Sequence, residues 1–510
     1  MAGSGLLRYA FFVLMAVVAL PSQSVAGGED TPFWYRQGDQ ALKRALAVTP
    51  NTRRARQVIL FVGDGNGVTS VTAARIFDGQ SKGGSGEENS LSFERFPYVA
   101  LAKTYNTDQQ TPDSAGTMTA MVTGVKTRAG VISLGPEVPR GDCREAGRHR
   151  LPTLLEQARD AGFATGIVTT TRVTHATPAA TYAHTPERDW ESDSDIPAVM
   201  KECARDIARQ LVENGPIDVV MGGGRRAFLP QGARDPEYRD IRGARADGRN
   251  LIADWQTRNP DGHYLWNRDQ FEQLPAKGPV LALFEPSHMH FEADREALDG
   301  NEPSLSEMTA NAIRRLEAND NGFLLVVEAG RIDHAHHAGN AYRALADGQE
   351  LSRAVQVAVE ATDADDTLIV VTADHSHVLT MAGYPVRGNP ILGKVVINDQ
   401  QGEPRRQPYK ALDGRPFTTL GYGNGPGYGR HETVDSRYRQ VPMPGRHLTQ
   451  GEETTGKDFH QETLVPLRSE THGGEDVAIY ARGPWAHLFH GVQEQNYIYH
   501  VIRHAMGSGN

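Results

Sequence analysis

The stretch that decides the fold reads FLLVVEAGRIDHAHH and covers residues 323–337 of the 510-residue chain. Its first five residues form a continuous apolar run, which is typical of a strand buried on both faces of a sheet. Glu328 follows at once. If a helix begins at Asp333, then Asp333 and His337 lie four residues apart on one helical face. An acid and an imidazole on one face suit a divalent cation. The alternative is a salt-bridge or capping pair.

The same pattern, an apolar run that ends in polar residues, recurs along the chain, with helical patterns in between. This alternation predicts an α/β fold with a central, largely parallel sheet flanked by helices on both faces. In such sheets ligands bind beyond the carboxyl ends of the strands. The other runs are 58–62, 165–169, 217–221, 368–371 and 477–480, and the helical patterns include 151–161, 198–214, 306–319 and 342–360.

The expected strand ends are rich in residues that bind metal ions. Asp64 stands in a glycine loop, and neither a dinucleotide fingerprint nor a phosphate-binding loop fits that loop, because position 68 is Val and no Gly-Lys-Ser/Thr follows. Taken singly, each acid or imidazole could belong to an ordinary turn. Taken together, they predict a site for several metal ions at one edge of the sheet. The residues at these ends are Asp64, His175, Thr177, Glu328, Asp374, His375 and His472.

Ser114 is the candidate nucleophile. It lies in TPDSAGT, residues 111–117, and an apolar helical pattern resumes at Met118. This places Ser114 near a helix N-terminus, where free N–H groups and the helix dipole favour an anion. Coordination by a metal ion can deprotonate such a hydroxyl without a histidine base. The alternative is a serine that only caps the helix.

Composition excludes several classes of protein. The chain is 39% hydrophobic and 23% charged, which is an ordinary globular balance, and its net charge is −10. A net acidic surface disfavours binding to nucleic acid. It does not count against small anionic substrates, because bound cations can invert the local field.

The N-terminus predicts export. Arg8 precedes an apolar run over 10–20 and a small-residue cleavage site, so residues 1–26 are expected to be a signal peptide. That run is too short to cross a bilayer, because a transmembrane helix needs about 20 apolar residues. The last residues lack the hydrophobic tail of a lipid-anchor signal. We expect a secreted or periplasmic protein with no membrane anchor. In an exported chain the two cysteines, Cys143 and Cys203, favour a disulfide over two buried thiols.

The region from 384 to 470 differs from the rest. It contains a glycine-rich run over 421–429, many Arg and few apolar runs, so we expect an inserted subdomain or a loop without a role of its own. The remaining residues, 27–383 and 471–510, are expected to form one catalytic α/β domain.

From Val58 to Val501 the sequence resembles the alkaline phosphatase family, most closely its animal branch. The resemblance is carried by DSAGT at 113–117, TTTRVTHATP at 169–178, EAGRIDHAHH at 328–337, TADHSH at 372–377 and THGGED at 471–476. It implies a metal-dependent phosphomonoester hydrolase of broad specificity. Such an enzyme acts through a phosphoserine and releases inorganic phosphate and an alcohol.

The resemblance also implies roles for individual residues. Ser114 would be the nucleophile, and Arg188 would bind the phosphate together with Asp113. Two zinc ions and one magnesium ion are implied, with His175 close to the magnesium. The bacterial enteric branch has an Asp where His175 stands. The implied ligands are Asp333, His337 and His472 for one zinc, Asp64, Asp374, His375 and Ser114 for the second, and Asp64, Thr177 and Glu328 for magnesium.

A fainter part of the resemblance concerns calcium. Glu237, Glu285, Glu302 and the carbonyl of Phe284 match segments that hold calcium in the animal branch, although the family has Asp where Glu302 stands. Carboxylates and a carbonyl suit that ion. The cysteines match a disulfide of the same branch. Residues 384–470 would form its crown-like subdomain at the interface of a homodimer.

Two groups of rival functions remain at this point. A phosphodiesterase or a sulfatase relative would use the same fold. However, Ser114 lacks the Pro and Arg pattern of a sulfatase, and a third set of metal ligands disfavours a diesterase. A non-catalytic exported metal-binding protein is the other rival, and it would not need Ser114.

Overall fold

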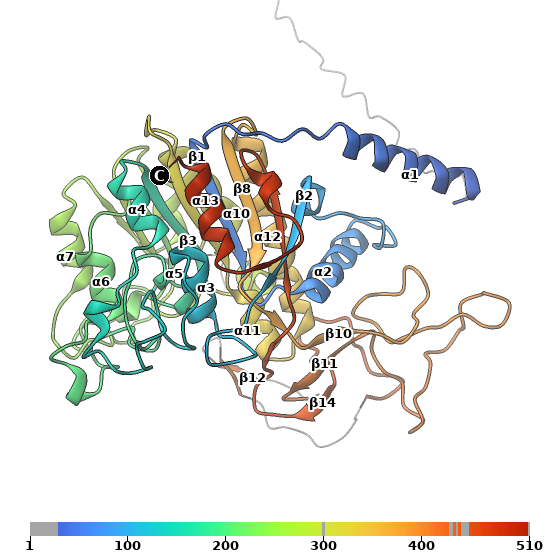
Figure 1. The fold of residues 1–510 in the computed structure, drawn as a ribbon. Helices are drawn as coiled ribbons and strands as arrows, with labels where there is room; N and C mark the ends of the chain where they lie inside the picture. Colours follow the sequence, from blue (N-terminus) through green and yellow to red (C-terminus); the bar gives the residue numbers. More distant parts are fainter. Residues whose placement is uncertain (1–28, 298–300, 428–431, 435–436, 440–447, 508–510) are drawn as a thin grey trace, which may run out of the picture. The chain divides into compact units, whose positions relative to one another are not determined.

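The computed structural model describes residues 29–297, 301–427, 432–434, 437–439 and 448–507 (Figure 1). The expected signal peptide, residues 1–26, lies outside them. The chain divides into two units, Met1–Thr49 and Pro50–Asn510. In the first unit, Asp30 caps helix α1 (Thr31–Leu46) by accepting a hydrogen bond from the Phe33 N–H at 2.8 Å. No residue of α1 is buried.

The second unit is built on a ten-stranded sheet in the order β17-β2-β16-β8-β1-β7-β3-β4-β6-β5. The block from β8 to β5 is parallel throughout, and β16 is antiparallel to both β8 and β2. The predicted, largely parallel sheet is therefore confirmed. Its strands are β1 (Gln57–Gly63), β2 (Tyr98–Lys103), β3 (Ala164–Arg172), β4 (Val219–Gly223), β5 (His263–Leu265), β6 (Val280–Leu283), β7 (Phe323–Ala329), β8 (Thr367–Ala373), β16 (Val477–Arg482) and β17 (Val492–Glu494).

Two separate apolar cores explain why the strands read as continuous apolar runs. In β1, Val58, Leu60 and Val62 enter one core, and Ile59 and Phe61 enter the other. Alternate side chains of a strand point to opposite faces, so a sheet covered on both sides needs apolar residues at every position. Helices α3, α4, α6, α7 and α13 supply the first core, and α2, α10, α11 and α12 supply the second.

The helices of this unit connect and cover the strands (Figure 1). Their bounds are α2 (Val68–Ser81), α3 (Ser114–Thr123), α4 (Leu154–Asp160), α5 (Ala176–Ala179), α6 (Ile207–Glu213), α7 (Leu251–Arg258), α8 (Arg268–Glu272), α9 (Glu292–Arg295), α10 (Leu305–Leu316), α11 (Arg331–His337), α12 (Ala341–Ala361) and α13 (Tyr497–Ala505). Short 3-10 turns are η1 (Ser92–Arg95), η2 (Ala146–Arg148), η3 (Ala198–Met200), η4 (Arg225–Phe228) and η5 (Ala486–Leu488).

One predicted helix is wrong in extent. The pattern over 198–214 forms only the short turn η3 and then α6, which begins at Ile207. Asp206 caps α6 by accepting a hydrogen bond from the Arg209 N–H at 2.9 Å, and its carboxylate also pairs with buried Arg245. An extended residue held by both contacts ends any helix that reaches it from the N-terminal side.

The region 384–470 contains small sheets. A three-stranded sheet joins β11 (Leu420–Gly425) to β10 (Leu379–Met381) and β14 (Thr463–Pro466). A two-stranded sheet pairs β12 (Glu432–Val434) with β13 (Arg437–Arg439). Just outside this region, a further two-stranded sheet pairs β9 (Ser376–His377) with β15 (His472–Gly473), and it carries two histidines of the site described below.

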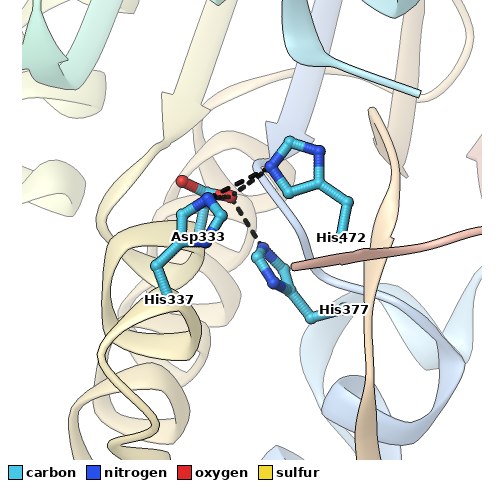
Figure 2. Close-up of side chains that lie close together, drawn as sticks. All are labelled: Asp333, His337, His377 and His472. Atoms are coloured by element: carbon cyan, nitrogen blue, oxygen red, sulfur yellow. Dashed lines mark hydrogen bonds and ion pairs between the residues drawn. The ribbon is translucent and has the colours of Figure 1, made fainter. Parts of the chain in front are cut away.

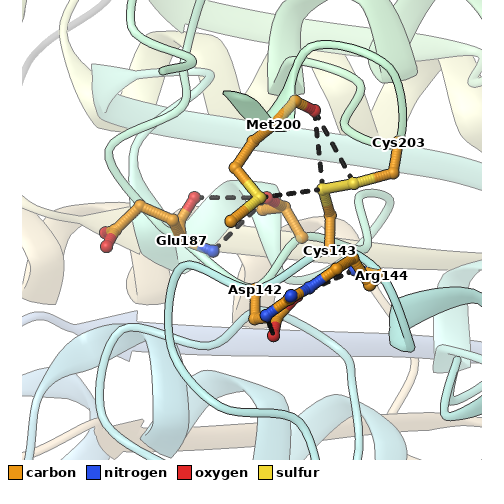
Figure 3. Close-up of a disulfide and its surroundings, with 7 residues drawn as sticks. Asp142, Cys143, Arg144, Glu187, Met200 and Cys203 are labelled. Atoms are coloured by element: carbon orange, nitrogen blue, oxygen red, sulfur yellow. Dashed lines mark hydrogen bonds and ion pairs between the residues drawn. A yellow bond between two sulfur atoms is a disulfide. The ribbon is translucent and has the colours of Figure 1, made fainter. Parts of the chain in front are cut away.

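The two cysteines are joined. Cys143 and Cys203 form a disulfide across 60 residues of sequence, beside Met200, as Figure 3 shows. The predicted disulfide is thus present in the structure. Closing a loop of this length stabilises a fold by roughly 4 kcal/mol in the chain-entropy account.

Among the described residues, no helix combines the length and apolar character needed to span a bilayer.

Candidate active site

The sheet brings the predicted polar strand ends together. β1 pairs in parallel with both β7 and β8, and Gly63 stands opposite Ala329 and Ala373. The residues that follow these strands therefore leave the sheet at one edge. Asp374 and His375 lie in a loop because β8 has ended, which is the condition under which both can face one ion. The Gly65 N–H donates to Asp374 Oδ1 at 3.0 Å and fixes that loop.

The first group, which we call the histidine cluster, consists of Asp333, His337, His377 and His472 (Figure 2). Helix α11 places Asp333 and His337 one turn apart, as predicted. The Nε2 atoms of His337 and His472 lie 3.3 and 3.4 Å from Asp333 Oδ1 and 3.1 Å from each other. Three donor atoms thus converge on one point, which suits a tetrahedral cation with an open position.

The outer nitrogens of two of these imidazoles are already used. His337 Nδ1 lies 2.6 Å from the carbonyl oxygen of Glu470, and His472 Nδ1 lies 2.7 Å from that of Pro112. A nitrogen facing a carbonyl must carry the proton and donate it. The Nε2 atoms are then unprotonated, which is the tautomer that a metal ion needs.

His377 was not given a role from the sequence. Its Nε2 lies 2.7 Å from Asp333 Oδ1, and its Nδ1 lies 2.5 Å from Glu470 Oε2. Burial opposes its charge, but Glu470 and Asp333 raise the pKa of His377 to about 10. An imidazolium between two carboxylates is better suited to orient Asp333 than to bind a cation. The His375-Ser-His377 spacing was a signal that could have found it, whereas nothing in the sequence distinguishes Glu470.

The second group, which we call the carboxylate cluster, consists of Asp64, Glu328 and Asp374. Donor atoms of Asp64 converge with those of Asp333 and His375 on one side and with those of His175 and Glu328 on the other. Both oxygens of Asp64, Oε1 of Glu328 and Oδ2 of Asp374 are buried without a hydrogen-bond partner. Buried anionic oxygens left free in this way fit cations as their missing partners.

The electrostatics of the carboxylate cluster point the same way. Burial, with the charges of Asp374 and Asp333, raises the pKa of Asp64 well above its ordinary value. Burial also raises the pKa of Asp374, and it raises the pKa of Glu328 to about 7. Hydroxyls of Thr169, Thr171 and Thr177 oppose the shift at Glu328. The Thr171 hydroxyl donates to Glu328 Oε2 at 2.9 Å, which places the expected threonine-rich strand end at this carboxylate.

Ser114 is the first residue of α3 and is 2% exposed. Its Oγ lies 3.2 Å from His375 Nε2. The interpretation of Ser114 as a capping serine is wrong, because Asp113 caps the helix and accepts a hydrogen bond from the Gly116 N–H at 3.1 Å. The Ser114 hydroxyl therefore faces an imidazole of the metal-binding groups.

Arg188 lies beside the same helix start. Its Nη1 donates to Asp113 Oδ2 at 3.0 Å, and its Nη2 lies 3.0 Å from His175 Nε2. Burial opposes ionisation of Asp113, but Arg188 and the Gly130 N–H hold the pKa of that carboxyl below its usual range. The structure thus brings the arginine expected to bind phosphate to Asp113, the residue that precedes the predicted nucleophile.

His175 belongs to a group of neighbouring imidazoles that the sequence did not predict. Its ring centroid lies 5.4 Å from that of His288 and 5.5 Å from that of His334. Burial, reinforced by nearby arginines, lowers the pKa of all three well below the ordinary value. They are neutral at physiological pH, so they add no positive charge that would repel a cation at Asp64 and Glu328.

The residues expected to bind calcium are only partly brought together. Glu285 and Glu302 converge with His290, whereas Glu237 and the Phe284 carbonyl both contact Arg225. Burial and the charge of Glu302 raise the pKa of Glu285 to about 8. The group of donor atoms that forms here therefore differs from the expected calcium set.

Comparisons with known proteins agree with this geometry. A family model described as alkaline phosphatase matches residues 55–508. The tissue-nonspecific isozyme of alkaline phosphatase from Gallus gallus is 45% identical over 507 residues, covering 97% of this chain and 93% of that protein. The isozyme from Homo sapiens is 44% identical over 508 residues, covering 97% and 92%.

Solved structures share the fold. The alkaline phosphatase of Thermus thermophilus superimposes with a TM-score of 0.62 at 24% identity, covering 90% of this chain and 93% of that chain. The enzyme from the Antarctic bacterium TAB5 gives a TM-score of 0.59 at 20% identity, covering 89% and 99%.

Proposed function

This chain belongs to the alkaline phosphatase family and is a phosphomonoester hydrolase, and on that premise we propose that Ser114 is its nucleophile. One observation carries the proposal: the buried Ser114 Oγ lies 3.2 Å from Nε2 of His375, which forms a group of metal-binding residues with Asp64 and Asp333. A non-catalytic metal-binding protein has no need of a hydroxyl there.

The donor sets support two zinc ions and one magnesium ion. Asp333, His337 and His472 would hold one zinc, and Asp64, Asp374 and His375 the other. Asp64, Glu328 and Thr177 would hold magnesium beside neutral His175. When bound, such ions lower the pKa of a coordinated hydroxyl and neutralise charge that develops on phosphate oxygens.

Ser114 and Arg188 carry the chemistry that belongs to the chain itself. The Ser114 oxygen attacks phosphorus in line with the leaving alcohol, and a phosphoserine forms as the ester bond breaks. Arg188 is positioned by Asp113 so that its planar fork can bind two non-bridging oxygens. Water then attacks the phosphoserine from the opposite side, which releases phosphate and restores Ser114. Two in-line steps give net retention at phosphorus.

The arginine fork and the metal-binding groups recognise the phosphate, so the proposal includes broad specificity for the alcohol. Export through the N-terminal signal and a homodimer with residues 384–470 as a crown-like subdomain belong to the same proposal. They are supported by the family relationship and by the disulfide between Cys143 and Cys203. Disulfides of this kind persist outside the reducing cytosol.

The test compares wild-type protein with Ser114→Ala. We expect the variant to keep its metal content by elemental analysis and to lose most hydrolysis of a phosphate monoester. A diester and a sulfate ester, assayed in parallel on the wild type, should react far more slowly. Unchanged monoester hydrolysis by Ser114→Ala would remove Ser114 from the mechanism, and preferred hydrolysis of either other ester would favour a relative on the same fold.

A further inference from the structure

A fourth group of metal-binding residues lies outside the active site described above. Glu285 follows β6, His290 lies a few residues later, and Glu302 precedes α10. His290 Nδ1 lies 3.6 Å from Glu285 Oε1 and 3.5 Å from Glu302 Oε2. Donor atoms of all three residues fall within 4.8 Å of one another.

The residues around this group do not assemble the oxygen shell that calcium prefers. Calcium takes six to eight oxygen ligands. Two of the expected ones are engaged by the guanidinium of Arg225, whose Nη2 donates to Glu237 Oε2 at 3.0 Å and whose Nη1 donates to the Phe284 carbonyl at 3.2 Å. Arg225 itself is fully buried and held by both oxygens of Asp235.

Glu302 provides an independent sign of a missing cation. Its side chain is 3% exposed, and its Oε2 has no hydrogen-bond partner. The backbone N–H of His290 donates to Oε1 of the same carboxylate at 2.8 Å, which leaves Oε2 directed at the other two residues of the group. On the other side, the Tyr238 hydroxyl donates to Glu285 Oε1 at 3.0 Å and fixes that carboxylate. Hydrogen bonds from groups outside the donor set, the His290 backbone and the Tyr238 hydroxyl, therefore orient both carboxylates.

We propose that Glu285, His290 and Glu302 bind a divalent first-row transition cation of the zinc type, in place of calcium. Two carboxylates and one imidazole form a mixed oxygen and nitrogen set, which suits zinc better than calcium. The charges of one dication and two carboxylates cancel. The ion ties the end of β6 and the segment around His290 to the start of α10, so its role is structural.

Elemental analysis after equilibration with zinc and dialysis tests the proposal without reference to activity. His290→Gln, which replaces the nitrogen donor by an amide, should hold one zinc equivalent less than the wild type and melt at a lower temperature in zinc. His149→Gln is the matched control, because His149 is partly exposed and its ring pairs with one carboxylate, that of Glu137, at 3.5 Å. It should keep every zinc equivalent. Equal zinc content in His290→Gln and the wild type would overturn the proposal.

A second measurement needs no variant. Crystals of the wild type grown with zinc and calcium at equal concentration should show anomalous scattering at the zinc edge between Glu285, His290 and Glu302. Calcium at that position, or no ion there while zinc occupies the active site, would overturn the proposal. Either result would leave the function of Ser114 unaffected, since the two sites share no residue.

Discussion

The histidine cluster and the carboxylate cluster lie at the same sheet edge but balance their charges in different ways. In the histidine cluster, burial opposes ionisation of Asp333, yet His337 and His377 hold the pKa of that carboxyl well below its ordinary value. In the carboxylate cluster, Asp64 faces mainly other acids, and its pKa is raised. The protein itself compensates the charge of the histidine cluster, whereas it leaves the charge of Asp64 largely uncompensated.

This difference indicates where the protein needs its metal ions most. Asp333 accepts contacts from three imidazoles, so its geometry is set before an ion arrives. Neither oxygen of Asp64 has a hydrogen-bond partner. Uncompensated buried charge is costly and is relieved by protonation or by a bound cation. We therefore expect the carboxylate cluster to be the more sensitive to loss of metal.

The largest effect is expected from Asp64→Asn, because Asp64 contributes to two groups of metal-binding residues. We expect kcat/KM for a phosphate monoester to fall on the order of 10³-fold or more, as bound ions supply several kcal/mol to such a reaction. Elemental analysis should show a loss of more than one metal equivalent, with the ion of the histidine cluster retained. Asp365→Asn is the control, since Asp365 is an exposed partner of Arg53 and should change the rate little. Full metal content in Asp64→Asn would show that the carboxylate cluster is not the more sensitive of the two clusters.

A smaller effect is expected from His377→Gln. His377 orients Asp333 but does not hold the ion in this account, and removing such a partner typically lowers metal affinity by about 10- to 100-fold. Zinc titration against a competing chelator measures it. Activity should return at high zinc with kcat near that of the wild type. A kcat that stays low at saturating zinc would show that His377 does more than orient a ligand.

The smallest effect is a pH dependence of stability in the metal-free protein. The pKa of His377 is raised from 6.5 to about 10, so between these values the folded state binds more protons than the unfolded state. Its contribution is full below pH 6.5 and is lost as the pH rises toward 10. One such group changes the free energy of unfolding by at most about 1.4 kcal/mol per pH unit.

Urea unfolding of chelated protein at pH 7 and pH 9 measures this slope. The pKa of Glu328 is raised to about 7, so this residue also lowers the free energy of unfolding as the pH rises, but mostly below pH 7. His377→Gln should therefore flatten the decline between pH 7 and pH 9. An equal decline in both proteins would mean that His377 is not charged in the fold.

The central strands could be predicted because they are buried on both faces. Residues 58–62 and 323–327 are apolar at every position, and they form the middle of the sheet. Strands β2 and β17 near one edge were not predicted. β2 alternates buried with less buried residues, and β17 has three residues of which none is buried, so neither has a continuous apolar run.

The candidate site could be predicted where its residues follow a strand. Asp64 and Asp374 converge because parallel strands end at one edge. Glu470 and His290 could not be predicted in this way. Glu470 reaches His377 through a contact across 93 residues, and His290 lies in a segment with no strand or helix of its own. Long-range contacts of loops depend on tertiary packing, which local pattern does not encode.

If Ser114 is the nucleophile, it carries the phosphoryl group during turnover. The most direct measurement is mass spectrometry of peptides from wild-type enzyme quenched in acid during turnover of a phosphate monoester. We expect phosphate on the peptide that contains Ser114, and none on that peptide from Ser114→Ala. Phosphate on another residue, or an unmodified Ser114 peptide in enzyme trapped at full turnover, would contradict it.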